Sequence, residues 1–125
     1  MALTVEELAA QIMASEDLGI LKVKVKEWAD KDSKPLALGI RVMTVGERDA
    51  YEREWIGKRE TGIDNFRTKF LARCLCHPET GERLFTDEQI EKLAGKSAKV
   101  VSKLFDSAMK HNAMSEEDVE ELAKN

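Results

Sequence analysis

Proline, cysteine and aromatic residues are scarce in this 125-residue sequence, which has two prolines, two cysteines and 6% aromatic side chains. Cys74 and Cys76 lie too close together to cross-link distant parts of a fold, so no disulfide framework is expected. No apolar run approaches the roughly 20 residues that a membrane-spanning helix needs, and residues 1–7 lack the basic-then-apolar pattern of a signal peptide. We therefore expect a soluble, cytosolic protein that does not contact a membrane.

Charged residues are abundant but nearly balanced. Twenty Lys and Arg residues oppose 24 Asp and Glu residues, which gives a net charge of -4 and a pI near 5.3. A protein of this charge is repelled by phosphate backbones, so general nucleic-acid binding is not expected. At 14.1 kDa, with 42% hydrophobic residues, the chain can form one core but is too short for two ordinary domains. We predict a single domain over residues 1–125, with residues 1–64 and 65–125 as its two parts.

The start of the chain changes from a helical to a strand periodicity. Thr4 and Glu7 match a capping box, and apolar residues then recur every three or four positions, which predicts a helix. Apolar and polar residues alternate at positions 21–25 and again at 36–42, on either side of a polar break. This alternation predicts an antiparallel β-hairpin at about residues 20–43.

The middle of the chain returns to a helical pattern. A second capping box at residues 44–47 predicts a charged helix, and the glycine-containing segment 57–62 predicts a loop. Apolar spacing then predicts a helix from Phe66 through Leu75. This helix should end before Pro78, because the residue that precedes a proline is disfavoured in the helical conformation.

The last third of the sequence predicts further helices. Residues 86–89 form a third capping box before a short helix that ends at Ala94, and Ser97 can cap a longer helix. Residues 115–118 predict the start of a final short helix. The predicted fold class is α+β, mainly helical with an antiparallel β-hairpin near the N-terminus.

The residues with catalytic or metal-binding chemistry are few. Cys74, Cys76 and His77 form the one cluster of soft ligands, and only His111 remains to complete the four that a closed zinc site requires. On a helix the two cysteines would point to different faces, so we expect only one of them in the core. The sequence contains no phosphate-binding glycine loop and no nucleophile elbow. We expect no catalytic residue, no metal and no cofactor, and therefore not an enzyme.

Residues 86–112 leave a second interpretation of function open. A helix, a glycine turn and a second helix, with five lysines and one acid from Lys92 to Lys110, fit a helix-turn-helix DNA reader. No Arg or Asn stands at the start of the second helix to read base edges, and lysines on the solvent face of a packed helix are the commoner case. A small DNA-binding regulator is therefore the alternative function.

The apolar stripe of the long C-terminal helix is either core or a surface for a partner. Regular stripes are usually core, but Met and Phe side chains also suit a partner with varied side chains. The same two interpretations apply to Trp28 and Trp55. The candidate partner-binding residues come from the first helix and from this long helix: Ile12, Met13, Val101, Leu104, Phe105, Ala108 and Met109.

Several strings from Asn65 onward resemble the tail assembly chaperones of long-tailed phages and prophages. The strings in this part are RCLC at 73–76, GERLFTDE at 81–88, KSA at 96–98, Leu104-Phe105, Asn112 and SEEDVEE at 115–121. The N-terminal part adds a Val/Lys strand that ends in Trp28 and a helix start, MTVGER, at 43–48. These strings are turns, caps and packing positions, so the resemblance concerns fold and lineage.

The resemblance implies a non-enzymatic protein of the host cell cytoplasm that is not retained in the virion. Such a chaperone binds and solubilises the long helical tape measure protein while tail tube subunits polymerise around it. Family members often exist also in a version extended by ribosomal frameshifting, which implies a contact of that product with the tail tube protein. Because a 14.1 kDa domain covers only a short stretch of a long helix, we also expect a homo-oligomer.

Overall fold

The structure is a computed structural model that describes residues 2–54 and 66–114. These residues form five α-helices, two short 3-10 helices and a three-stranded antiparallel sheet. The fold class is therefore α+β, mainly helical with a β-hairpin near the N-terminus, as the sequence predicts.

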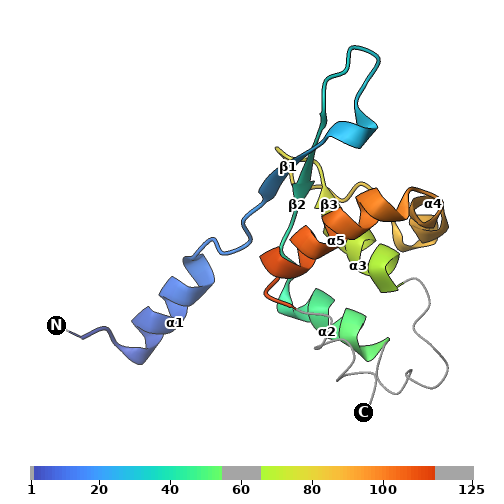
Figure 1. Cartoon of the computed structure of the whole chain (residues 1–125). Coiled ribbons are helices and arrows are strands. Elements are labelled where there is room, and N and C mark those ends of the chain that lie inside the picture. Colours follow the sequence, from blue (N-terminus) through green and yellow to red (C-terminus); the bar gives the residue numbers. More distant parts are fainter. Residues whose placement is uncertain (1, 55–65, 115–125) are drawn as a thin grey trace.

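Helix α1 (Val5–Ala14) stands apart from the rest of the molecule (Figure 1). Its predicted capping box is present. The Glu7 backbone N–H donates to the Thr4 hydroxyl at 3.1 Å, and the Thr4 N–H donates to the Glu7 carboxylate at 3.1 Å. None of the residues in α1 is buried, so the helix is held by its own hydrogen bonds and cap rather than by packing on the core.

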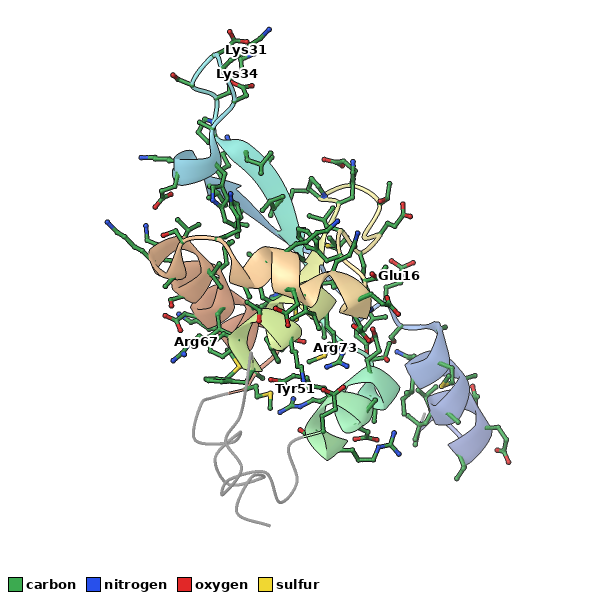
Figure 2. All side chains as sticks on the ribbon, turned by 90° about the vertical axis from the view of Figure 1, so that its right-hand side faces the viewer. Glu16, Lys31, Lys34, Tyr51, Arg67 and Arg73 are labelled. Carbon is green, nitrogen blue, oxygen red and sulfur yellow. The ribbon has the colours of Figure 1, made fainter. Side chains whose placement is uncertain are left out.

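The predicted hairpin is present as strands β1 (Leu21–Val25) and β2 (Leu36–Ile40), paired antiparallel with Val25 opposite Leu36. A 3-10 turn, η1 (Lys26–Trp28), follows β1. The strand order is β1-β2-β3, so β1 forms one edge of the sheet, and its lysines alternate with its apolar residues. Lys31 and Lys34 project at the tip of the hairpin (Figure 2).

Helix α3 (Phe66–Cys74) is shorter than predicted, because Leu75 and Cys76 form strand β3. Ile40 of β2 lies opposite Leu75 in an antiparallel pair. The apolar spacing of this segment suits a helix, but pairing with β2 satisfies the backbone groups of Leu75 and Cys76 in an extended conformation. The prediction of a helix that includes Leu75 is therefore wrong.

Helix α2 (Val45–Arg53) begins at the predicted capping box, in which the Thr44 hydroxyl accepts from the Glu47 N–H. Arg73 of α3 connects this helix to the core. Its Nη2 lies 2.6 Å from Oε1 of Glu54, and its guanidinium lies 5.3 Å from the centre of the Tyr51 ring (Figure 2). Trp55 and the predicted loop at 57–62 lie outside the described residues.

The C-terminal part contains the 3-10 turn η2 (Asp87–Gln89), helix α4 (Ile90–Ala94) and helix α5 (Ala98–His111). Ser97 is the N-cap residue of α5, as predicted, but its side chain makes no capping hydrogen bond. Residues 115–118, which the sequence predicts to begin a last helix, lie outside the described residues.

The core lies where α5 packs on α3 and the sheet. Its centre is a group of aromatic rings that meet edge to face. Phe70 is 5.2 Å from Tyr51 and 5.7 Å from Phe105, and Phe105 is 5.6 Å from Phe66, measured between ring centroids. Such edge-to-face pairs add stability beyond the area that they bury.

Asn112 connects the end of α5 to the segment between β2 and α2. Its side-chain oxygen accepts from the Met43 N–H at 2.8 Å, and its side-chain nitrogen donates to the carbonyls of Ala108 at 2.9 Å and Arg41 at 3.2 Å. Asn112 is buried, so these bonds replace the water that its amide and the Met43 N–H lose on folding.

Arg41 and Glu47 form a two-pronged ion pair between β2 and α2. The two guanidinium nitrogens donate to the two carboxylate oxygens at 2.6 and 2.8 Å. These hydrogen bonds from Arg41 are the main cause that lowers the pKa of the Glu47 carboxyl from 4.5 to about 2. The carboxylate is thus stabilised in its charged form in the folded protein.

We expect stability to depend on the ionisation of Glu47. Because the pKa of Glu47 is lowered on folding, its contribution is complete above about pH 4.5 and is lost as the pH falls through about 2. Urea unfolding at a series of pH values measures this dependence. Between pH 4.5 and 2 the free energy of unfolding should fall less in Glu47→Gln than in the wild type. Gln at this position keeps the capping box, so the change isolates the ion pair.

The matched control is Glu79→Gln, which removes the exposed pair of Glu79 with Lys22. Exposed pairs contribute little to stability, so its pH profile should follow the wild type. Profiles of Glu47→Gln and wild type that run parallel between pH 4.5 and 2 would contradict the assignment.

Candidate partner-binding surfaces

The structure corrects the predicted partner surface on α5. All five of its candidate residues are at most 5% exposed: Val101, Leu104, Phe105, Ala108 and Met109. They face α3 and the sheet, where Phe105 takes part in the aromatic group of the core. The stripe on α5 is therefore part of the core and not a partner surface, because a partner cannot reach these side chains without unpacking α5.

The other two candidates lie on an open surface. Ile12 is 70% exposed and Met13 is 84% exposed, and Val5 and Leu8 of the same helix are exposed as well. We call these four residues the α1 apolar face. Their spacing places them along one side of the helix. Within residues 2–54 and 66–114 no element covers this face.

The N-terminal segment that contains α1 is acidic. Residues 2–19 contain Glu6, Glu7, Glu16 and Asp17 and no Lys, Arg or His. Two of the acids lie in the first turn of α1, where they favour the helix dipole. Glu16 lies in the segment that joins α1 to the sheet (Figure 2). The α1 apolar face is thus flanked by negative charge only.

A second open apolar surface lies between the hairpin and α4. It is a cavity of about 520 Å³ that we call the Trp28 groove. Its lining comes from the end of η1, strands β2 and β3, the segment before η2, and α4 with the residues just after it: Trp28, Ala29, Leu36, Leu38, Leu75, Leu84, Phe85, Lys92, Leu93 and Lys96. Leu36 and Leu84 remain exposed, so the groove presents apolar side chains to solvent. The sequence analysis considered Trp28 for a partner surface but did not predict the groove.

Positive charge borders this groove. Lys92 and Lys96 both line it and both are exposed. Among residues 2–54 and 66–114, neither lysine forms an ion pair. An apolar floor with two unpaired cations at its border favours an apolar ligand that carries acidic groups.

The two thiols are buried. Burial raises the pKa of the Cys74 thiol from 9.0 to about 12 and also raises that of Cys76. A thiol with a raised pKa is a poor nucleophile. The prediction that only one of the two cysteines belongs to the core is wrong, because Cys76 lies in β3 rather than on the exposed side of a helix.

Both histidines make hydrogen bonds with the backbone, His77 within its own turn and His111 across the fold. The His77 Nδ1 accepts from the N–H groups of Glu79 and Thr80 at 3.0 and 3.3 Å, which fixes the turn after β3. The His111 Nε2–H donates to the carbonyl of Gly19 at 2.8 Å. In the part of the chain that the structure describes, no group of three or more His, Cys, Asp or Glu is placed to hold a metal ion.

The two helices on which the DNA-binding alternative depends are α4 and α5. Helix α4 has five residues, and α5 turns its apolar side to the core, which leaves Lys99, Lys103 and Lys110 on the exposed side. The Lys103 Nζ lies 3.3 Å from the Glu27 carboxylate, so one of these lysines already has an acidic neighbour.

Comparison with known proteins identifies a similar fold. The chain is an α+β protein of the same fold as a solved structure, the crystal structure of the protein YqbN, a target of the Northeast Structural Genomics Consortium. The two structures match with a TM-score of 0.53 over 83% of this chain and 94% of that chain, at 15% sequence identity. No family model matches the sequence, and no curated protein matches it. Among the described residues, no helix is long and apolar enough to cross a membrane.

Proposed function

We propose that this protein is a phage tail assembly chaperone that binds and solubilises the tape measure protein while the tail tube polymerises, and that it acts in the host cell cytoplasm without remaining in the virion. The observation that carries this proposal is the pair of open apolar surfaces, the α1 apolar face and the Trp28 groove. A chaperone for a long helical protein needs apolar surface that its own fold leaves uncovered.

The Trp28 groove has the chemistry to receive a helix of such a client. Helix-in-groove recognition places the apolar side of an amphipathic helix on an apolar floor, and charged groups at the border fix its orientation. Trp28, Leu84 and Phe85 supply the floor, and Lys92 and Lys96 supply the border. We therefore expect the bound segments of the tape measure protein to carry acidic side chains beside their apolar stripe.

The sequence strings that resemble tail assembly chaperones support the same proposal. Several of them occupy structural positions that define the fold. Asn112 holds the end of α5, Leu104 and Phe105 lie in the core, and Met43 to Arg48 span the start of α2. Other strings include residues that line the groove, namely Leu75, Leu84, Phe85 and Lys96. The expected contact of an extended product with the tail tube protein is part of the proposal.

Co-expression with the tape measure protein encoded in the same genome tests the proposal. The wild-type chain should raise the soluble fraction of the tape measure protein and copurify with it. Leu84→Glu places a charge in the apolar groove. It should weaken the apparent affinity for the tape measure protein by at least about tenfold, and so reduce both its soluble fraction and its copurification. Val45→Glu, at an exposed apolar residue of α2 outside the groove, is the matched control and should act as the wild type.

The alternative function gives the opposite result. If the chain leaves the tape measure protein insoluble but binds duplex DNA with an affinity that falls steeply with salt, it is a DNA-binding regulator instead. In that case Lys99→Glu on the exposed side of α5 should weaken DNA binding, and Leu84→Glu should not.

A further inference from the structure

The chain carries two open surfaces that complement each other. The α1 apolar face belongs to an amphipathic helix flanked only by acids, and the Trp28 groove is an apolar cavity bordered by lysines. The groove favours a helix of this kind as its ligand, because an apolar floor matches the apolar face and the lysines attract the flanking acids. Helix α1 has ten residues and so spans about 15 Å, which suits a compact groove.

The position of α1 favours the groove of another molecule over its own. The Ile20 side chain is fixed against the sheet, since a Cβ on Gly39 would come within 2.8 Å of it, and Gly19 is held by His111. Only residues 15–18 are then left as a linker, with a reach of about 14 Å.

The linker alone does not span to the far end of the groove, so α1 would have to turn back toward the hairpin to enter the groove of its own chain. Leu36 lines the groove opposite Val25, about 17 Å along β1 from Ile20. In Figure 1 α1 also points away from the hairpin and from α4, which form the groove.

We propose that the α1 apolar face of one copy docks in the Trp28 groove of a second copy of this chain, with the acids of the donor segment facing Lys92 and Lys96 of the acceptor. Each copy offers both a helix and a groove, so the contact joins two different surfaces. The buried side chains on the donor are Val5, Leu8, Ile12 and Met13. This contact requires no client, and it assigns Ile12 and Met13 to self-association. A client helix would compete with α1 for the same groove, so a bound client would displace the neighbouring copy.

Sedimentation velocity of the purified full-length chain tests the contact. The wild type should associate as its concentration rises from micromolar to near-millimolar. Ile12→Glu removes the donor, and Leu84→Glu removes the acceptor. Each should weaken association by at least about tenfold, because each places a charge in an apolar contact. Val45→Glu should associate as the wild type.

Mixing the two variants gives the decisive result. Ile12→Glu keeps an intact groove and Leu84→Glu keeps an intact α1, so an equimolar mixture should form a complex of two chains although neither variant associates alone. Recovery in the mixture also shows that both variants are folded. Both substitutions lie at exposed positions.

The charges at the border provide a further comparison. Lys92→Glu combined with Lys96→Glu should weaken association, whereas Lys99→Glu, at an exposed lysine that does not line the groove, should leave it unchanged. A wild type that remains monomeric, an Ile12→Glu variant that associates normally, or a mixture that stays monomeric would each overturn the proposal. Because no client is present, these outcomes test self-association separately from the binding of the tape measure protein.

Discussion

Replacing Phe105 with alanine is expected to destabilise the fold by roughly 3–5 kcal/mol, the usual cost of truncating a buried phenylalanine. Phe105 is fully buried, and its ring meets those of Phe66 and Phe70 edge to face. The variant therefore loses both the buried apolar area and the aromatic pairs, and it leaves a cavity between α3 and α5. Thermal unfolding followed by circular dichroism should show a melting temperature lower by about 10 °C or more.

The matched control for Phe105→Ala is Ile12→Ala. It also removes a large apolar side chain from a helix, but Ile12 is exposed. In dilute protein it should change the melting temperature only slightly, as most surface substitutions do. If Phe105→Ala melted close to the wild type, α5 would not be the central helix of the core, and its apolar side would again be a candidate for the partner surface.

Replacing Asn112 with alanine should be the second most damaging change. The Met43 N–H would lose its acceptor, and the carbonyls of Arg41 and Ala108 would lose a donor. The unsatisfied Met43 amide alone should cost about 1–3 kcal/mol, because it remains buried without water. Urea unfolding should show a lower midpoint with an unchanged slope, since the surface exposed on unfolding stays nearly the same.

Gln11→Ala is the control for Asn112→Ala, because it removes a side-chain amide from an exposed helical position. Its urea midpoint should match the wild type. A neutral Asn112→Ala would mean that water replaces the amide between α5 and the segment after β2, and that Asn112 does not hold these two parts together.

Local sequence signals were sufficient for most of the fold. The capping boxes at Thr4 and Thr44 mark helix starts because a side chain within three residues satisfies the free backbone groups. The alternation in residues 21–25 and 36–40 likewise predicts two extended strands, although burial increases along each strand rather than alternating. Each of these signals depends on neighbours in the sequence, so each is visible without the structure.

Strand β3 and the Trp28 groove could not be predicted in the same way. Leu75 and Cys76 are extended because β2, some 35 residues earlier in the chain, offers them hydrogen-bond partners. The groove joins residues from η1, the sheet and α4, and no local pattern relates Trp28 to Lys96. Both features arise from tertiary contacts.

The candidate partner-binding residues show that helical periodicity predicts an apolar stripe but not whether the stripe is buried. The stripes of α1 and α5 have the same helical spacing, and spacing alone does not tell which stripe has a partner within the fold. The structure covers Val101, Leu104 and Phe105 and leaves Ile12 and Met13 open. The acidic flanks of α1, with no basic residue before Lys22, were a further signal, because they match the lysines of the groove.

Among residues 2–54 and 66–114 no strand pairs with the outer edge of β1, and this edge affects how crowded copies behave. An unpaired strand edge is a template on which other chains can add strands, and such addition leads to fibres. Lys24 lies along this edge and Lys26 follows it, and Lys22 beside them is paired with Glu79, so two edges that approach still bring lysines together. Lysines at such positions oppose edge-to-edge addition of strands. A chain that associates through a helix in a groove can thus reach high local concentration without its sheets fusing.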